Sequence, residues 1–239
     1  MDQGHFARVL AGIAQTLITE YGIADVLYSL CDEVVTLLPV TGAGVMLTGG
    51  DQRLVFAASS DAAFAEVEAL QEQLDEGPCH TAFHEGAPVL SSDLAIDTRF
   101  PTFAPHATAA GVRSAHAFPV QVHDRRIGAL SLYAEGVVDL DDEERGAAAT
   151  LASSAAAFVL NHRALDEAVV LAEQLQRALD SRVIIEQAKG KLGEQLSCTP
   201  PEAFEVLRRH SRNNGQRLAD VSARVVDGTL LLQFGPHAE

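Results

Sequence analysis

The feature that most constrains the fold is the stretch "DDEERGAAATLASSAAAFVLNHRALDEAVVLAEQLQRAL", residues 141–179. It contains no proline and only one glycine, Gly146. Because proline and glycine are the residues that most often interrupt helices, this stretch predicts one long helix. Seven of its positions follow the spacing 4, 3, 4, 3, 4, 3, which is the heptad rhythm of a helix that packs along a partner. They are Phe158, His162, Leu165, Val169, Ala172, Gln176 and Leu179. His162 and Gln176 make the seam imperfect, and packing on the helix's own domain stays an open alternative.

The residues before this helix mix helical and strand patterns. Apolar spacing predicts two helices within residues 5–38, and shorter helical segments at about 61–75 and 78–84. Runs rich in small and β-forming residues predict the strands 42–50, 53–60, 87–92, 114–122 and 126–134. The last two runs flank "HDR", which indicates a hairpin. The fold class predicted for this part is α+β, with an antiparallel sheet flanked by helices.

The residues after the long stretch predict a bundle of three helices. The first continues to Leu196, the second begins at Thr199 with a capping box to Glu202, and the third covers about 216–227. Gly215 and Gly228 are the expected stops. The expected inward-facing residues are Ile184, Ile185, Ala188, Leu192 and Leu196, then Ala203, Phe204, Leu207 and Ser211, and then Leu218, Val221 and Val225. Such a bundle has room for a core but none for a ligand pocket.

The charge of the chain is divided unevenly. The formal net charge is -16, yet residues 1–175 hold eight arginines against 25 carboxylates (8 - 25 = -17). Residues 176–239 hold seven arginines and both lysines of the chain, Lys189 and Lys191, against eight carboxylates (9 - 8 = +1). Such an asymmetry indicates different partners for the two parts. By itself, a set of arginines on a helix is most often a solvated face.

Several classes of function have no signal in the sequence. No apolar run reaches the length of a membrane span, and the first residues lack a basic signal-peptide region, so we expect a cytoplasmic protein without membrane contact. Three cysteines without C-x-x-C spacing favour reduced thiols over a disulfide framework or a zinc site. His80 and His84 have metal-compatible spacing but no third ligand. We therefore expect no catalytic residues, no metal and no cofactor.

Cys79 allows two interpretations. It follows Gly77 and Pro78 at an expected helix start, where the helix dipole lowers a thiol pKa, and His80 is adjacent. This arrangement is compatible with a redox-sensing or catalytic thiol. The other interpretation is a small buried residue beneath the sheet, which we favour because free cysteine is usually buried.

Residues 175–226 contain the core "SRVIIEQAKGKL", the second helix "AFEVLRRHS" and the third helix "RLADVS". In their order and spacing these motifs resemble the ANTAR family of RNA-binding antiterminator domains. It implies a protein that binds a pair of short RNA stem-loops through dimerised domains and prevents an intrinsic terminator from forming. Gly193 stands where the family commonly has methionine, and Ser222 where it has alanine. These departures concern packing more than the cationic surface.

The resemblance also implies which residues contact RNA. Cations bind phosphates, and arginine planes recognise bases that are splayed from a hairpin loop. The expected RNA-binding residues are Arg182, Lys189, Gly190, Lys191, Arg208, Arg209, Arg212 and Arg217. Gly190 would allow the close approach of a backbone, either from RNA or from a second helix.

Residues 1 to about 160 are similar to a GAF domain, through "DEGPCHTAFHEGAPV", "DTRFPTFAPHATAAGVRSAHAFPV" and "RRIGALSLY". GAF domains usually have a pocket over their sheet. The residues that we expect near such a sensor pocket are Cys79, Arg113, His116, Phe118 and Tyr133. Strand alternation does not say which face carries the pocket.

The sequence thus predicts a GAF-like sensor at 1–160, a connecting helix or coiled coil at 161–178 and an ANTAR RNA-binding domain at 175–230. We expect a homodimer that presents its ANTAR domains to RNA stem-loops under control of an unknown small-molecule or protein signal at the sensor. The alternative is a ligand- or redox-sensing module that acts through protein partners without RNA. A thiol enzyme that uses Cys79 and a DNA-binding bundle are further alternatives.

Overall fold

The computed structural model of the chain describes residues 3–16, 22–49 and 53–233. The chain forms two compact units, Met1–Ala164 and Leu165–Glu239. Helix α6 (Asp142–Leu196) is 55 residues long and contributes to both units. The long helix predicted from the proline-free stretch 141–179 is therefore confirmed, and it is not interrupted. Among the described residues, none of the helices combines the length and apolar character that a membrane span requires.

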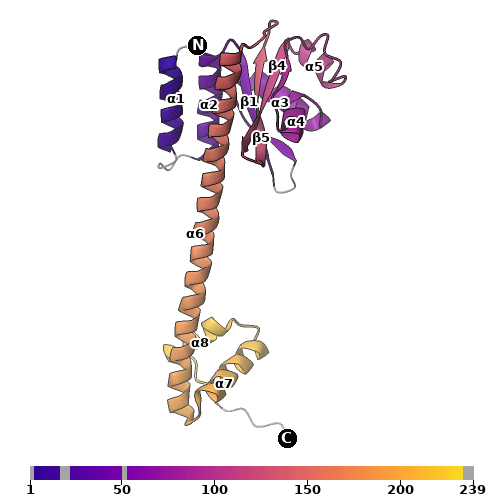
Figure 1. Ribbon diagram of the computed structural model, residues 1–239. Helices are drawn as coiled ribbons and strands as arrows, with labels where there is room; N and C mark the ends of the chain where they lie inside the picture. Colours follow the sequence, from indigo (N-terminus) through magenta and orange to yellow (C-terminus); the bar gives the residue numbers. More distant parts are fainter. Residues whose placement is uncertain (1–2, 17–21, 50–52, 234–239) are drawn as a thin grey trace. The chain divides into compact units, whose positions relative to one another are not determined.

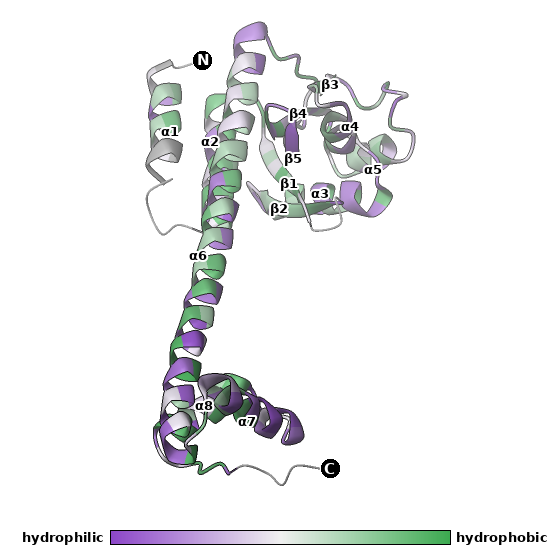
Figure 2. Ribbon diagram, turned by 60° about the horizontal axis from the view of Figure 1, so that its bottom comes forward, coloured by the Kyte–Doolittle hydropathy of each residue, from purple (hydrophilic) through white to green (hydrophobic). Residues whose placement is uncertain are grey.

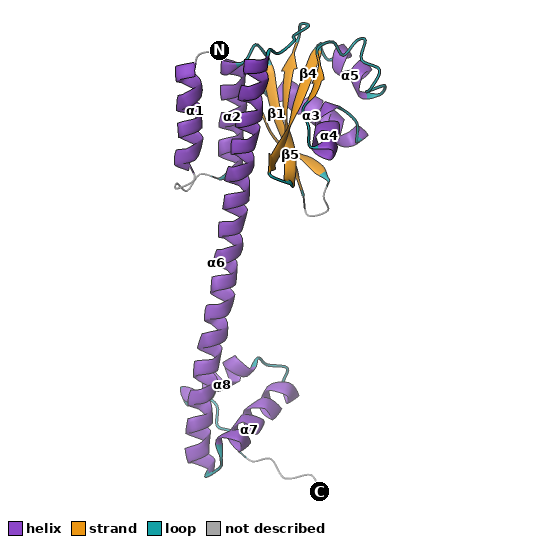
Figure 3. Ribbon diagram, viewed as in Figure 1, coloured by secondary structure: helices purple, strands orange, loops and turns teal. Residues whose placement is uncertain are grey.

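The first unit is built on a five-stranded sheet (Figure 3). The strands are β1 (Gly42–Thr48), β2 (Leu54–Ser59), β3 (Val89–Ser91), β4 (Ser114–Val122) and β5 (Arg125–Ala134). Their order is β2-β1-β5-β4-β3, and each neighbouring pair is antiparallel. The five predicted strand segments are thus confirmed, and His123 and Asp124 of "HDR" form the turn of the β4–β5 hairpin, with His123 at a φ of 53°.

Helices cover both faces of this sheet (Figure 1). Helix α2 (Ile23–Leu37) and the start of α6 pack on one face, and α1 (Gln3–Thr16) lies beside α2. Helices α3 (Ala62–Leu74), α4 (Pro78–Glu85) and α5 (Phe103–Ala109) cover the other face. The α+β class predicted from the sequence is confirmed. Each face carries its own apolar core, because successive strand residues point to opposite sides.

Helix α5 was not predicted from the sequence pattern. It is only seven residues long and contains Pro105, so it shows no clear helical period. A distant residue completes its first turn: the Glu76 carboxylate accepts the backbone N–H of Thr102 at 2.7 Å and of Phe103 at 2.8 Å. This contact caps the orphan N–H groups of the helix and lowers the pKa of Glu76.

The second unit is the predicted three-helix bundle, formed by the end of α6, α7 (Pro200–Asn213) and α8 (Leu218–Val226). Its core contains Ala188, Leu192, Ala203, Leu207, Val221 and Val225. The Glu202 carboxylate reaches back to the backbone N–H of Thr199 at 2.8 Å, as the capping box predicts. Gly215 and Gly228 adopt φ values of 60° and 85°, which suit glycine at helix ends.

Candidate nucleic-acid interface and sensor core

Helix α7 carries a cationic face opposite the bundle core. Ala203, Val206, Leu207 and Ser211 are its buried residues. Arg208, Arg209 and Arg212 lie on the other side of the helix and are exposed, and Figure 2 shows the hydrophilic colouring that dominates α7. Arg208 forms an ion pair with Glu205 at 3.3 Å, one turn earlier on the same surface. The three arginines expected at RNA therefore form one solvent-facing surface.

The two lysines of "AKGKL" have different surroundings. The Lys191 ammonium donates to the Val226 carbonyl oxygen at 2.9 Å, at the C-terminal end of α8. This contact is favourable because unpaired carbonyls give a helix C-terminus a partial negative charge. Lys189 lies on a different face, where its ammonium pairs with Glu186 at 2.8 Å and lies 5.9 Å from the centre of the Phe204 ring. Lys191 thus stabilises the bundle, and Lys189 borders α7.

Phe204 differs from the sequence prediction, which put it on the inner face of α7. It is only partly buried and lies outside the apolar core of the bundle. Val206 instead occupies a buried position on that helix. The difference arises because positions 203, 206 and 207 already complete the inward stripe, which leaves position 204 at its border. The border is the side that carries Lys189.

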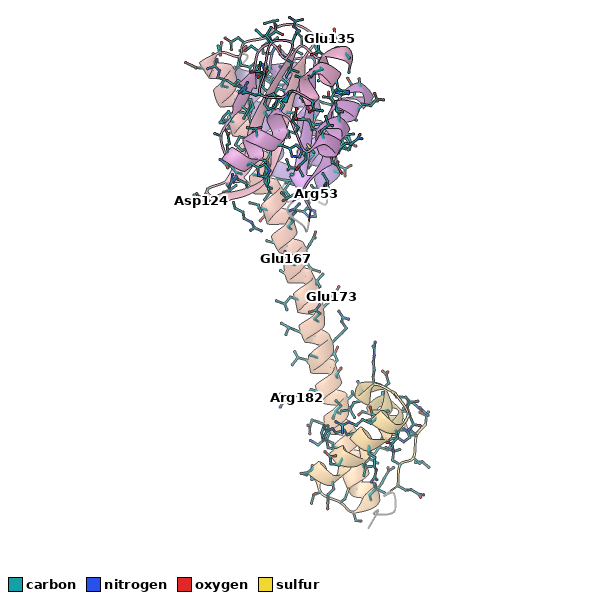
Figure 4. The ribbon with its side chains drawn as sticks, turned by 90° about the vertical axis from the view of Figure 1, so that its right-hand side faces the viewer. Arg53, Asp124, Glu135, Glu167, Glu173 and Arg182 are labelled. Carbon is teal, nitrogen blue, oxygen red and sulfur yellow. The ribbon has the colours of Figure 1, made fainter. Side chains whose placement is uncertain are left out.

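The remaining expected RNA residues are exposed. Arg182 projects from α6 (Figure 4), and Arg217 occupies the N-cap position of α8. Gly190 is exposed, and a Cβ added to it would meet nothing within 4 Å. The bundle itself therefore does not require glycine at position 190.

The two departures from the ANTAR pattern have local structural consequences. A Cβ at Gly193 would lie 3.1 Å from the Cys198 carbonyl oxygen, because the chain turns tightly between α6 and α7. Ser222 is fully buried, and its hydroxyl has no hydrogen-bond partner in the described part of the chain. Glycine at position 193 therefore suits the turn, whereas serine at position 222 leaves a buried polar group unsatisfied.

The structure does not bring the five expected sensor residues to one pocket. Cys79 and Tyr133 lie on the face that α3, α4 and α5 cover. Phe118 packs into the opposite core with α2 and α6, and His116 shares its side of β4, with Nε2 3.1 Å from the Val138 carbonyl oxygen. Arg113 lies at the sheet end and pairs with Asp93 at 2.6 Å.

A buried polar network fills the space between α3 and the sheet. The Tyr133 hydroxyl donates to Glu68 Oε1 at 2.9 Å and accepts from Gln71 Nε2 at 2.7 Å. Gln71 Oε1 in turn accepts the backbone N–H of Cys79 at 3.0 Å. The Phe64 ring stacks on Tyr133 with centroids 5.5 Å apart. The network therefore joins α3, the start of α4 and β5.

Sequence reasoning missed Glu68, Gln71 and Phe64 because a glutamate and a glutamine on an amphipathic helix are normally assigned to the solvent side. One available signal was the pair Gly42 and Gly44, which share one face of β1. A Cβ at Gly42 would come within 2.1 Å of the Phe64 ring, and one at Gly44 within 2.3 Å of Glu68 Oε1. Two glycines on one strand face thus indicate that large side chains approach it.

The electrostatics of this network are those of a buried acid. Glu68 has no exposed surface, and its Oε2 has no hydrogen-bond partner among the described residues. Burial raises the pKa of Glu68 to about 7, although the hydrogen bond from Tyr133 opposes the rise. Burial, with Glu68 nearby, also raises the pKa of the Tyr133 phenol. Near neutral pH, Glu68 thus exchanges between its protonated and ionised forms.

The cysteines of this unit lack the surroundings of reactive thiols. Cys79 is fully buried, and its pKa is raised by burial and by Glu68, so the expected lowering by the helix dipole does not prevail. Burial likewise raises the pKa of Cys31. Cys31 belongs to the core of the α2 face and Cys79 to that of the α4 face, so the sheet separates them. The buried interpretation of Cys79 is the one that the structure supports.

His80 is buried, its Nδ1 lies 3.0 Å from Asp75 Oδ1, and burial lowers the pKa of the imidazole. Within the described ranges, no group of three His, Cys, Asp or Glu side chains is arranged to hold a metal ion.

Two surface hollows lie near the α3–α5 face. A cleft of about 180 Å³ is lined by Thr41, Asp61, Phe64, Val67, Gly111 and Glu135, among others. Phe64 thus lines this cleft and also covers Tyr133. A wider groove of about 540 Å³ runs between α5 and the preceding loop, and its lining is mostly apolar, with Leu94, Phe100 and Pro101.

Comparison with protein families identifies the two parts. Residues 21–159, more than half of the chain, match the GAF domain. The chain belongs to the GAF domain family. Residues 173–226 match the ANTAR domain, so this is a GAF–ANTAR protein, as the sequence motifs predict. ANTAR domains are RNA-binding antitermination domains and GAF domains are signalling domains, so the general role is that of a regulator.

Solved structures of GAF domains are among those that are similar to this chain. The GAF domain of a phosphoenolpyruvate-protein phosphotransferase from Coxiella burnetii is 15% identical, with a TM-score of 0.56 over 70% of this chain and 99% of that chain. Its Acinetobacter counterpart is 16% identical, with a TM-score of 0.54 over 70% and 99%. A free methionine-R-sulfoxide reductase from Neisseria meningitidis is 18% identical, with a TM-score of 0.53 over 67% and 91%. Such identities show the fold alone. No curated protein matches the chain significantly.

Proposed function

We propose that this GAF–ANTAR protein is a transcription antitermination regulator whose ANTAR domains, paired in a homodimer, bind paired RNA stem-loops. The GAF domain acts as the sensor that controls how the two ANTAR domains are presented. The protein acts in the cytoplasm, where nascent transcripts are formed, and it has no catalytic activity of its own. The proposal rests on the ANTAR domain and on the distribution of charge and apolar surface over the second unit.

The observation that carries the RNA proposal is the arginine face of α7. Arg208, Arg209 and Arg212 project to solvent from one helix in the only part of the chain with an excess of cations. Arginine binds phosphate through a fork of N–H donors and stacks on exposed bases, which are the two contacts that a hairpin loop offers. Arg182 and Arg217 supply further cations, whereas the contact between Lys191 and Val226 favours a structural role for that lysine.

An exposed apolar seam on α6 supports the homodimer. Seven of the twelve large apolar side chains that are exposed among the described residues lie between 165 and 183. Four of them continue the heptad spacing, namely Leu165, Val169, Leu179 and Val183, with exposed fractions of 54–58%. A single helix has no reason to expose such a stripe, and a second copy of α6 would cover it. Gly190, seven residues after Val183, extends the seam to a position open to a second helix.

Charges beside this seam favour a parallel pair. If Val169 and Leu165 are the a and d positions, the e positions are Asp166, Glu173 and Asp180. In an antiparallel pair these acids would face one another, whereas in a parallel pair they face the uncharged g residues Asn161, Ala168 and Leu175. A parallel dimer also places both ANTAR domains at the same end of the paired helices, which two stem-loops on one RNA require.

The signal at the GAF domain is proposed to be a small molecule or a protein. The cleft beside Phe64 and the buried network beneath it offer a path for such a signal, because the network joins α3, α4 and β5. If the chain instead acts through protein partners alone, its ANTAR unit will show no preference for RNA.

A binding experiment tests the function directly. The full chain is titrated onto an RNA with two adjacent stem-loops, and the affinity is followed at several salt concentrations. We expect binding that weakens steeply as salt rises, and an Arg208→Ala, Arg209→Ala variant whose affinity is at least about tenfold lower. Arg125→Ala is the control, because Arg125 is an exposed arginine of the GAF unit. Equal binding of duplex DNA, or unchanged affinity in the double variant, would contradict the proposal.

A further inference from the structure

Phe204 is an aromatic side chain that the bundle leaves at its border. It is the only phenylalanine, tyrosine or tryptophan in residues 165–233. Its ring is partly exposed, and the apolar core of the bundle is complete without it. An isolated exposed apolar residue is common on protein surfaces, so exposure alone gives Phe204 no function. Its electrostatic surroundings are what distinguish it.

A cation of α6 contacts the Phe204 ring, and two arginines follow Phe204 along α7. The Lys189 ammonium of α6 lies 5.9 Å from the ring centre, within the range of a cation–π contact. Its other partner is Glu186, at 2.8 Å, which fixes the ammonium beside the ring. Arg208 and Arg212 follow Phe204 at spacings of four and eight residues along α7, so they continue the same edge of the helix.

This arrangement fits an unpaired nucleotide better than a protein side chain. A nucleotide combines a flat base, which stacks on an aromatic ring, with an anionic phosphate, which pairs with a cation a few ångströms away. Loop nucleotides of a hairpin offer both groups, whereas paired bases are already stacked on their neighbours. The phosphates on either side of a stacked base would reach Lys189 in one direction and Arg208 in the other.

We infer that Phe204 is a stacking platform for one unpaired base of the RNA loop, with Lys189 and Arg208 holding the adjoining phosphates. This inference rests on the proposed RNA-binding function and adds to it the contact that recognises single-stranded loop bases. It separates two kinds of residue on one surface. The arginines set the salt-dependent part of the affinity, and Phe204 sets a part that salt does not change.

The chain contains no tryptophan, which allows a direct test. In Phe204→Trp the new indole is the only one in the protein, and stacking on a base quenches its fluorescence. Stem-loop RNA should quench this emission at the concentrations at which it binds. If the RNA binds as tightly as it does to the wild type without changing the emission, the inference is wrong. Quenching by polyglutamate but not by RNA would point to an acidic protein partner and would also overturn it.

Two further variants separate stacking from packing. Phe204→Leu keeps an apolar side chain but removes the ring, and we expect an affinity about tenfold lower with the same salt dependence. Phe204→Tyr keeps the ring and should retain most of the affinity. Circular dichroism of both variants verifies that the bundle is folded, and should Phe204→Leu not fold, the tryptophan experiment decides. A wild-type chain that binds no RNA refutes the proposed function, whereas equal affinity of wild type and folded Phe204→Leu refutes only the stacking role.

Discussion

Individual residues of this protein illustrate how burial overrides residue type. Glu68 is an acid in a protein with many acids, yet it is enclosed between α3 and the sheet, and its Oε2 has no hydrogen-bond partner in the part of the chain that the structure describes. Lys191 is a cation within an expected RNA motif, yet its ammonium donates a hydrogen bond to a carbonyl oxygen at the C-terminal end of α8. In both cases the residue type indicates solvent, and a contact distant in sequence determines the environment.

The raised pKa of Glu68 predicts a dependence of stability on pH. Its pKa is about 7 in the folded state and 4.5 in a solvated reference, so between these values only the folded state holds the proton. Stability therefore falls as pH rises from about 4.5 to about 7, by up to about 3 kcal/mol, and changes little above that range. Urea unfolding of the wild type and of Glu68→Gln across this range checks the prediction.

The glutamine variant is the appropriate comparison because it retains the shape of the side chain but does not titrate. The buried imidazoles His80 and His116 have lowered pKa values, so they contribute the opposite slope in both proteins. The difference between the two curves isolates Glu68. A difference that stays constant from pH 4.5 to pH 7 would contradict the buried-acid assignment.

Ser222 predicts a stabilising substitution. Its hydroxyl is buried in the ANTAR bundle and finds no partner among the residues that the structure describes, so it loses hydration without gaining a hydrogen bond. Ser222→Ala removes that unsatisfied group at nearly constant volume and should raise the free energy of unfolding by about 1 kcal/mol. Ser154→Ala is the control, since the Ser154 hydroxyl already donates to the Thr150 carbonyl oxygen at 2.8 Å. Chemical denaturation followed by circular dichroism measures both, and destabilisation by Ser222→Ala would contradict the reasoning.

At the scale of elements, local sequence patterns predicted well whether a segment forms a helix or a strand. They predicted poorly what each element packs against. The strands, the β4–β5 hairpin and the stops at Gly215 and Gly228 follow from propensity and turn chemistry. Helix α5 does not, because its first turn depends on Glu76 from another part of the chain. The inner face of α7 was predicted except at Phe204. Phe204 lies at the border of the apolar stripe, and the burial of a border residue depends on how closely the neighbouring helices approach it.

The seam of α6 gives a prediction at this scale. Val169→Asp together with Leu179→Asp places two charges on the proposed dimer surface, and we expect the molecular mass in solution to fall from that of a dimer to that of a monomer. Analytical ultracentrifugation measures this change. Leu171→Asp is a matched control, because Leu171 lies on the same helix with a similar exposed fraction of 55% but outside the heptad seam. Equal effects of both changes would argue against the seam.

At the scale of the whole molecule, the two parts of the chain differ in charge: residues 1–175 carry a formal charge of -17 (8 - 25) and residues 176–239 one of +1 (9 - 8). The acidic GAF unit shields two buried cores and a titrating network, and the ANTAR unit displays cations. The proposed function adds a homodimer, for which the binding of two stem-loops gives a reason. Two modest ANTAR–loop affinities become one strong affinity only when a dimer lets both act on the same RNA.

This dimer argument predicts a difference between RNAs. An RNA with two stem-loops should bind at least about a hundredfold more tightly than one with a single stem-loop. The advantage should disappear in the Val169→Asp, Leu179→Asp variant, while its affinity for a single stem-loop should stay unchanged. Titrations of both RNAs with both proteins test this. If the monomeric variant still bound the RNA with two stem-loops more tightly than the RNA with one, a single chain would contact both stem-loops.

The sequence alone determined the elements other than α5, the α+β class and the family, because these depend on local periodicity, turn residues and contiguous motifs. It also determined the long α6, since residues 141–179 contain no proline and only one glycine, Gly146, which the helix tolerates. Only the tertiary structure decided which residues share an environment. Glu68 and Tyr133 are 65 residues apart and meet only after the sheet has formed. Alternation and the β4–β5 register put His116 and Phe118 on one face and Tyr133 on the other. Which helices cover each face, and therefore that Cys79 of α4 lies on the side of Tyr133, depends on long-range packing.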